Sequence, residues 1–409
     1  MFPAYQLNLF SSLSLIPFVS PSIAVALVGK LKRSANKKEL KGGYTTGACA
    51  AAATRAAVRY LVSGQRFSDI EITLPNRQLV TFELARLEGE HEIVAGVIKD
   101  AGDDPDCTHG IEIQCIARKV KQQGITLIGG KGVATVTLPG LELSVGEAAI
   151  NPVPRKNILE MAALEWQFSE NTQTDKFGLE LEICVPRGEE VAKETISERL
   201  GLLGGISILG TRGTVKPYST SAFAASVRQS VQIASANGRG QMVLTTGSRS
   251  EKAAMALLPE LSEMSFIQAG DFMGVGLRAA KRYQAEQVTM VAMIGKMGKL
   301  VSGRMMTHVS GHAIDFAHLA QLAREEKIPE TVCSQIAEAN TGRHVLSLLS
   351  GIDSSLYLRR ICKEAHQHAV RYTAEALVIN VILIDFDGSL LACHPQLSQQ
   401  FNCLNNKVD

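Results

Sequence analysis

The sequence predicts an α/β protein in which an α+β N-terminal domain is followed by a doubly wound, mostly parallel α/β domain. Apolar and polar residues alternate in short runs over residues 70–138, as in strands with one buried face. After residue 187, apolar strand runs alternate with helical segments, which is typical of a parallel sheet covered on both faces. A chain of 409 residues is also too long for one small core.

Changes in composition divide the chain into four expected segments. They are an extension at residues 1–40, an α+β domain at 41–186, an α/β domain at 187–390 and a tail at 391–409. In the extension a basic cluster follows the apolar run, the reverse of a secretory signal, and Pro17 and Pro21 interrupt a spanning helix. We interpret it as a poorly ordered extension, and a membrane anchor stays the alternative.

Overall composition excludes several classes of protein. The net charge of +2 predicts no nucleic-acid partner, and 45% hydrophobic residues with 20% charged ones indicate an ordinary soluble globular protein. The eight cysteines have no C-x-x-C spacing, so we expect neither a zinc site nor a disulfide framework. Scattered thiols favour a reducing compartment and a cytoplasmic location.

A helix is expected at residues 44–61, where Thr45, Thr46 and Gly47 precede an alanine-rich run. Free backbone N–H groups at this helix start would favour an anion, such as a carboxylate or a phosphate. The alternative is an alanine-rich helix that packs closely on a sheet.

The remaining elements of the first half follow from periodicity. A hairpin is expected around Pro75-Asn76-Arg77. Strands are expected at residues 70–74, 79–84, 93–98, 111–117, 125–127, 133–138 and 179–185, and a helix at 158–168.

In the second half we expect strands at residues 205–209, 241–244, 264–268, 288–294 and 377–386, with helices at 219–236, 250–258 and 272–285. Ligands of such sheets bind outside the carboxyl ends of the strands. The loops at residues 210–213, 245–248, 270–271 and 295–296 are therefore expected along one edge.

Six segments, in order, resemble the cobalt-precorrin-5B C1-methyltransferases, the CbiD family of the anaerobic cobalamin pathway. They are Thr45-Thr46-Gly47 with the alanines after it, and residues 99–110, 146–155, 204–211, 270–272 and 294–300. The resemblance implies an enzyme that methylates C1 of cobalt-precorrin-5B to give cobalt-precorrin-6A, with S-adenosylmethionine as cosubstrate. Cobalt would arrive with the tetrapyrrole, so no protein metal site is expected.

The methyl donor needs glycine turns, a carboxylate for its ribose and hydrogen-bond donors for its own carboxylate. The candidates for cofactor binding are Gly210, Thr211, Thr246, Gly247, Asp271, Gly295 and Lys296. Asp271 directly follows a predicted strand, as a ribose ligand would. The glycines alone indicate little, since every doubly wound fold has such turns.

The macrocycle implied by the resemblance has acetate and propionate arms, so its site needs cationic groups. The candidates for substrate binding are Thr45, Thr46, Gly47, Arg155 and Lys299. The alternative for any one lysine or arginine is a solvated surface charge.

An acidic loop at residues 100–106 contains four aspartates and is followed by His109. Asp103, Asp104 and His109 are candidate catalytic residues that would remove a proton, and crowding of like charges should raise at least one carboxyl pKa. Calcium or magnesium binding is the alternative use of this loop.

His308 is the fourth catalytic candidate, because the family pattern retains Thr307 and His308 although Met306 and Val309 depart from it. Two other functions remain open: a non-enzymatic tetrapyrrole or nucleotide carrier, and a metal-dependent hydrolase that uses His308, His312 and Asp315. The sequence leaves open whether the protein is a homo-oligomer.

Overall fold

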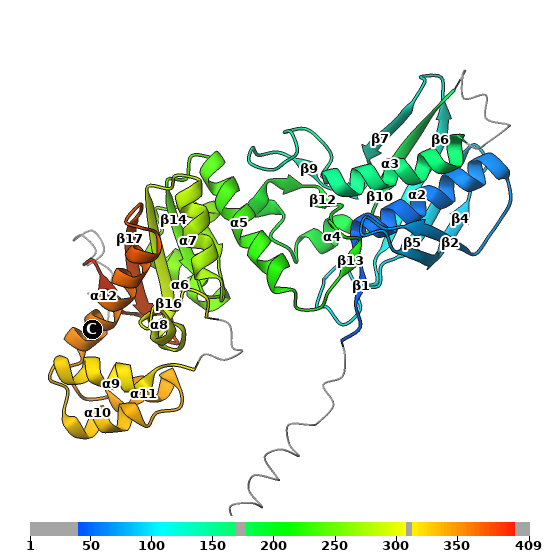
Figure 1. Ribbon diagram of the computed structural model, residues 1–409. Coiled ribbons are helices and arrows are strands. Elements are labelled where there is room, and N and C mark those ends of the chain that lie inside the picture. The colour runs from blue at the N-terminus through cyan, green and yellow to red at the C-terminus, as the bar shows by residue number, and fades with distance from the viewer. Residues whose placement is uncertain (1–39, 168–176, 308–312, 397–409) are drawn as a thin grey trace, which may run out of the picture. The chain divides into compact units, whose positions relative to one another are not determined.

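The computed structural model describes residues 40–167, 177–307 and 313–396 (Figure 1). Residues 1–39 of the expected extension (1–40) and residues 397–409 of the expected tail (391–409) lie outside this part of the chain. The first residues of that tail instead belong to a strand, residues 390–394. The mixed α/β class that the sequence predicts is confirmed.

The first large sheet has the strand order β4-β5-β6-β10-β7. Its strands are β4 (Arg86–Glu88), β5 (Glu92–Ile98), β6 (Glu112–Val120), β10 (Gly178–Cys184) and β7 (Ile125–Gly129). Neighbours are antiparallel except β10 and β7, which run parallel. Helices α2 (Thr46–Ser63) and α3 (Pro152–Gln167) pack side by side on this sheet (Figure 1).

Helix α2 is the expected alanine-rich helix, capped at its start by Thr45 and at its end by Gly64 in the left-handed conformation. Residues Ala50 to Ala53 are fully buried. Their small side chains let α2 lie close to both α3 and the sheet, as the alternative interpretation of this segment predicts.

The expected hairpin is confirmed as β2 (Asp69–Thr73) and β3 (Leu79–Glu83). Short two-stranded pairs complete this half. They are β1 (Gly43–Tyr44) with β13 (Thr214–Val215), β8 (Gly132–Val133) with β12 (Gly205–Ile206), and β9 (Thr135–Val136) with β11 (Leu202–Leu203).

Two strand predictions in this region were wrong. The expected strand at residues 133–138 is interrupted and forms β8 and β9. The expected strand at 205–209 does not join the parallel sheet, since β12 pairs with β8. A Cβ on Gly205 would lie 2.0 Å from the carbonyl oxygen of Gly132, so this pairing requires glycine.

The second large sheet has the order β15-β14-β16-β17-β18. Its strands are β15 (Phe266–Gln268), β14 (Gln241–Thr245), β16 (Gln287–Met293), β17 (Val378–Ile384) and β18 (Leu390–His394). The first four are parallel, as expected, and β18 is antiparallel to β17. Strand β18 was not expected from the sequence, which predicted a tail from residue 391.

Helices cover both faces of the second sheet. Met242 and Leu244 of β14 pack in one cluster with α7 (Met273–Arg282), whereas Val243 between them packs with α6 (Ser248–Leu257) on the other face. The remaining helices are α4 (Gly188–Ala192), α5 (Thr220–Ala236), α8 (Ile294–Leu300), α9 (Phe316–Glu325), α10 (Glu330–Ala337), α11 (Gly342–Leu348) and α12 (Ser355–Tyr372), with the 3₁₀ turns η1 (Glu198–Leu200) and η2 (Glu263–Ser265).

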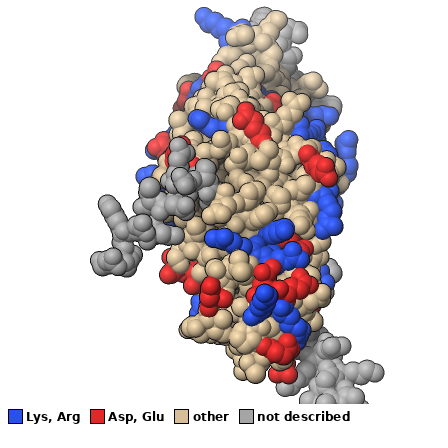
Figure 2. Space-filling model, turned by 90° about the vertical axis from the view of Figure 1, so that its left-hand side faces the viewer, with Lys and Arg blue, Asp and Glu red and all other residues tan. Residues whose placement is uncertain are grey.

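Acidic and basic side chains are interspersed on the surface shown in Figure 2, in keeping with the small net charge. None of the helices in the described ranges combines the length and apolar character that a membrane crossing requires.

Glu165 of α3 joins the two helices on the first sheet, since its Oε1 accepts from Arg55 Nε at 2.8 Å and Arg59 Nη2 at 2.7 Å. We expect Glu165→Gln to lower the free energy of unfolding by about 1–3 kcal/mol, because two partly buried cations lose their anion. Urea denaturation at neutral pH measures this loss.

The matched control is Glu160→Gln, whose side chain is 53% exposed and lies 3.8 Å from Lys156. It should cost less than about 0.5 kcal/mol.

Burial raises the pKa of Glu165, but the hydrogen bonds from Arg59 and Arg55 outweigh burial and hold the pKa below its usual value. The stabilisation is therefore present above the ordinary carboxyl pKa and is lost as pH falls through the folded pKa. An equal difference between wild type and Glu165→Gln at pH 7 and pH 2 would contradict this account.

Candidate functional site

The start of α2 is bound to residues 207–213 rather than open to a ligand. The Gly47 N–H donates to the carbonyl of Leu209 at 3.0 Å, and the Ala48 N–H donates to Thr45 Oγ1 at 3.2 Å. The Leu209 N–H in turn donates to Thr46 Oγ1 at 2.9 Å. The expected anion cradle of free N–H groups is therefore wrong for Gly47 and Ala48, because both donors have partners within the protein.

Gly210 and Thr211 lie beside this cap and not at the edge of the parallel sheet, which corrects their expected position. Gly210 has a φ of +127°, and a Cβ on it would lie 2.4 Å from Thr45 Cβ. The cause is the pairing of β12 with β8, which keeps residues 205–213 with the first half of the chain.

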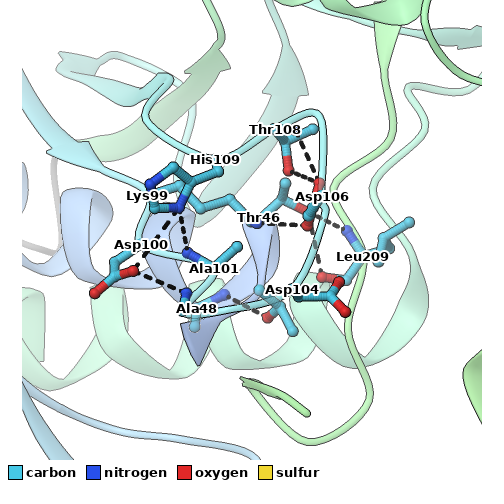
Figure 3. A network of polar contacts seen from close by, with 12 residues as sticks. Thr46, Ala48, Lys99, Asp100, Ala101, Asp104, Asp106, Thr108, His109 and Leu209 are labelled. Carbon is cyan, nitrogen blue, oxygen red and sulfur yellow. Dashed lines mark hydrogen bonds and ion pairs between the residues drawn. The ribbon is translucent and has the colours of Figure 1, made fainter. Parts of the chain in front are cut away.

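Lys99 and the acidic loop form a polar network beside the cap (Figure 3). Lys99 follows β5, and its side chain is only 1% exposed. Its Nζ lies 2.6 Å from Asp106 Oδ2. Asp106 Oδ1 accepts from both the N–H and the hydroxyl of Thr108, at 2.8 and 2.6 Å.

The pKa of Asp106 is shifted downward, so Asp106 is not the carboxyl whose pKa crowding was expected to raise. Burial raises it, but the hydrogen bonds from Lys99 and Thr108 outweigh burial. The cause is that a buried cation and a hydroxyl face this aspartate.

The three catalytic candidates of the loop have different surroundings. Asp103 is exposed. Asp104 Oδ1 accepts from the Tyr218 N–H at 2.8 Å. His109 Nδ1 accepts from the Ala101 N–H at 3.1 Å, which assigns its proton to Nε2. In this tautomer Nε2 of His109 carries the proton, and the lone pair of Nδ1 is already engaged by the Ala101 N–H.

One cleft is lined by Thr45 and Thr46 together with Lys99, Asp106 and Thr108. Other polar residues of its lining are absent from the sequence-based candidates: Glu142, Asn151, Thr195, Ser197, Ser207, Ser226, Arg228, Gln229, Gln232, Arg282 and Tyr283. Asn151 and Ser207 do belong to segments that resemble the CbiD family, so the resemblance was a signal for those two. Thr211 also borders the cleft.

A second group of candidates lies at the carboxyl ends of β14, β15 and β16, where Thr246, Gly247, Asp271 and Gly295 follow their strands. A Cβ added to Gly247 or Gly295 would meet open space. These two glycines therefore leave room for a ligand to approach the backbone.

Asp271 is held by neighbouring side chains at this edge. Lys296 Nζ donates to Asp271 Oδ1, and the hydroxyl of Thr307 donates to the same oxygen at 2.5 Å. Gly295 and Lys296 were expected in a loop, but both belong to the first turn of α8.

Lys299 and Arg155 are not brought to the cap. Lys299 Nζ donates to the carbonyl of Thr307 at 2.9 Å, which places it with the cofactor candidates. Arg155 is half-buried in the first turn of α3. Neither residue lines the cleft at Thr45 and Thr46.

His308 and His312 lie outside the described residues. Asp315, the third proposed ligand of the hydrolase alternative, caps α9, since its Oδ1 accepts from the His318 N–H at 2.9 Å. Within the described ranges no group of three or more His, Cys, Asp or Glu side chains is placed to hold a metal ion.

Two family models match this chain. Residues 33–217 match the model described as CbiD, and residues 306–395 match the one described as the C-terminal domain of CbiD.

The match to curated relatives extends over almost their whole length. A Leptospira interrogans protein named cobalt-precorrin-5B C(1)-methyltransferase is 48% identical over 355 residues, which is 87% of this chain and 95% of the relative. A Geobacillus sp. protein of the same name is 44% identical, and the match covers 87% of this chain and 96% of the relative. The crystal structure of a cobalamin biosynthesis protein (cbiD) from Archaeoglobus fulgidus matches 70% of this chain and 84% of that chain, at 26% identity and a TM-score of 0.35.

The contact between Gly210 and Thr45 predicts that Gly210→Ala destabilises the cap. The added Cβ must displace Thr45, and we expect a loss of about 2–4 kcal/mol from overpacking, backbone strain and weakened capping. Chemical denaturation followed by circular dichroism measures it.

Gly204→Ala is the matched control, because Gly204 also has a positive φ, of +83°, but a Cβ there would meet nothing within 4 Å. It should cost about 1–2 kcal/mol from backbone strain alone. Equal losses for the two variants would show that Thr45 does not restrict position 210.

Proposed function

The chain belongs to the CbiD family of cobalt-precorrin-5B C1-methyltransferases, and on this premise we propose that it transfers the methyl group of S-adenosylmethionine to C1 of cobalt-precorrin-5B, giving cobalt-precorrin-6A. It is a methyltransferase of cobalamin biosynthesis. The observation on which this rests is the 48% identity over 95% of a curated relative.

The chemistry requires little from the protein beyond positioning. A carbon of the macrocycle supplies an electron pair to the methyl group, the carbon–sulfur bond breaks, and S-adenosylhomocysteine leaves as a neutral thioether. Holding donor and acceptor in line provides most of the acceleration of such a transfer.

We place the methyl donor at the carboxyl ends of β14, β15 and β16. The open space at Gly247 and Gly295 supports this, because the ligand can approach the backbone there. A carboxylate has about four acceptor positions, so Asp271 can accept from ribose hydroxyls while it is held by Lys296 and Thr307. Thr246 would contribute its hydroxyl at the same edge.

We place the macrocycle in the cleft at Thr45 and Thr46, whose lining includes the cations Arg228 and Arg282. Gly47 and Gly210 would support this cleft indirectly, since they allow the close packing of the cap. Arg155 remains a candidate for a carboxylate arm, although it does not line the cleft.

We also propose a cytoplasmic location and a proton acceptor for the reaction. The cysteines in the described ranges are free thiols, which supports a reducing, cytoplasmic compartment. We propose Asp103 or Asp104 as the proton acceptor, because Nδ1 of His109 already accepts from the Ala101 N–H.

A combined binding and turnover measurement tests this function. We expect the purified protein to bind S-adenosylmethionine in calorimetry and to add one methyl group to cobalt-precorrin-5B, as detected by mass spectrometry. Asp271→Asn should weaken binding of S-adenosylmethionine and S-adenosylhomocysteine by about tenfold, the effect of one lost charged hydrogen bond.

Asp69→Asn is the matched control, since Asp69 is an exposed aspartate whose described side-chain contact is with Ser68. It should leave both affinities unchanged. A protein that binds neither nucleoside and methylates nothing would refute the proposed function. Normal binding by Asp271→Asn would refute only the placement of the ribose.

A further inference from the structure

Lys99 is a buried cation that the assignments above do not use. Its side chain is 1% exposed, and its described partner is Asp106, at 2.6 Å. Burying an ammonium group costs several kcal/mol unless a counterion compensates it. The lysine also acts on the thiol of Cys49 in the first turn of α2, so it lies near the positive end of that helix. Buried Lys99 therefore needs the carboxylate of Asp106 as its counterion.

The two members of the pair differ in their access to the cleft. The Asp106 side chain is 25% exposed, whereas Lys99 has almost no contact with solvent. Both oxygens of Asp106 are fixed, one by Lys99 and the other by Thr108. The cleft therefore meets a carboxylate that cannot rotate away, and the lysine acts through it.

A fixed carboxylate repels the acidic arms of the macrocycle. Cationic groups elsewhere in the lining, such as Arg228, attract the same arms. Repulsion at one wall and attraction at another select one orientation of a ligand that has carboxylates around its rim. The ring edge that faces Asp106 would then be the one poorest in acidic arms.

We propose that Lys99 is a positioning residue for the methyl transfer: it holds Asp106 ionised and fixed at the cleft wall, and this charge orients the anionic macrocycle. The inference rests on the proposed function and adds to it how the substrate is oriented. It predicts an effect on kcat that is separate from the strength of substrate binding.

Three variants test the role. Lys99→Arg keeps a cation beside Asp106 and should retain kcat within about threefold. Asp106→Asn removes the charge, and the double variant Lys99→Met/Asp106→Asn removes it without leaving a buried unpaired ammonium. For both of these we expect kcat to fall at least tenfold while KM for cobalt-precorrin-5B is unchanged or lower, because the macrocycle binds in unproductive orientations.

A pH profile separates orientation from mere structural support. Other ionisable groups around the pair are the thiol of Cys49, on which Asp100 also acts, and the thiol of Cys107, on which Glu194 also acts. Glu142 is a further carboxylate in the lining of the cleft. Lys99→Met leaves Asp106 without its cation, so the acidic limb of kcat should move to higher pH. The limb should stay in place in Lys99→Arg and in the control Lys121→Met, since Lys121 is exposed and far from the acidic loop in sequence.

Affinity for S-adenosylhomocysteine and the thermal midpoint monitor folding in every variant. The inference is wrong if the double variant keeps normal kcat, or if its KM for the macrocycle rises at least as much as kcat falls. If the double variant fails to fold, Lys99→Arg provides the test instead. Loss of kcat in folded Lys99→Arg protein also contradicts the inference.

Binding of a porphyrin with acetate and propionate arms separates this inference from the proposed function. If the wild type binds the porphyrin but does not methylate cobalt-precorrin-5B, the proposed function fails. Asp106→Asn should then still bind the porphyrin about threefold to tenfold more tightly, because one local repulsion is removed. If Asp106→Asn binds the porphyrin as weakly as the wild type or more weakly, the Asp106 carboxylate does not face the macrocycle and the inference is wrong.

Discussion

The candidate sites depend on the exchange of hydrogen bonds between the first turn of α2 and residues 207–213. Thr46 and Leu209 bond each other although 163 residues separate them in the chain. This contact orders the cap of α2, requires glycine at position 210 and sets the place where the acidic loop and Lys99 meet the cleft. The start of α2 holds two distant segments of the chain together and does not bind an anion through free N–H groups. The charges that a ligand meets come from side chains around this joint between the two segments.

Electrostatics near this joint follows from burial. Burial alone would raise the pKa of Asp106, but the bonds from Lys99 and Thr108 lower it and fix the carboxylate in place. At the edge of the second sheet, Asp271 is similarly fixed by Lys296 and Thr307. Both proposed sites therefore contain an aspartate whose orientation is set by the protein before any ligand arrives, and preorganised groups of this kind favour precise positioning over flexible recognition.

The sequence predicted those parts of the fold whose signals are local. The alanine run with its threonine cap predicted α2, alternation around Pro75 predicted the hairpin, and the apolar runs after residue 240 predicted the parallel strands. It failed for residues 205–209, because Gly205 and Ile206 pair with a two-residue strand more than 70 positions earlier, and nothing local specifies that partner. The sequence predicted two groups of site residues, one for the methyl donor and one for the macrocycle. Gly210 and Thr211 were expected along the parallel sheet with the first group, but they lie beside the cap of α2 because their position follows from that same distant pairing. Lys99 was overlooked as a site residue, since a lysine after a strand is usually exposed and only the folded chain buries it.

The second sheet ends on one side with β15, which has three residues. An outer strand of that length presents few unpaired backbone groups, so a strand from another molecule has little to add to. On the other side, β18 reverses direction and covers the apolar strand β17. The short outer strand β15 thus limits the risk of aggregation at one border of a strongly apolar parallel sheet, a safeguard of value to an enzyme whose ring-shaped substrate is itself large and partly apolar.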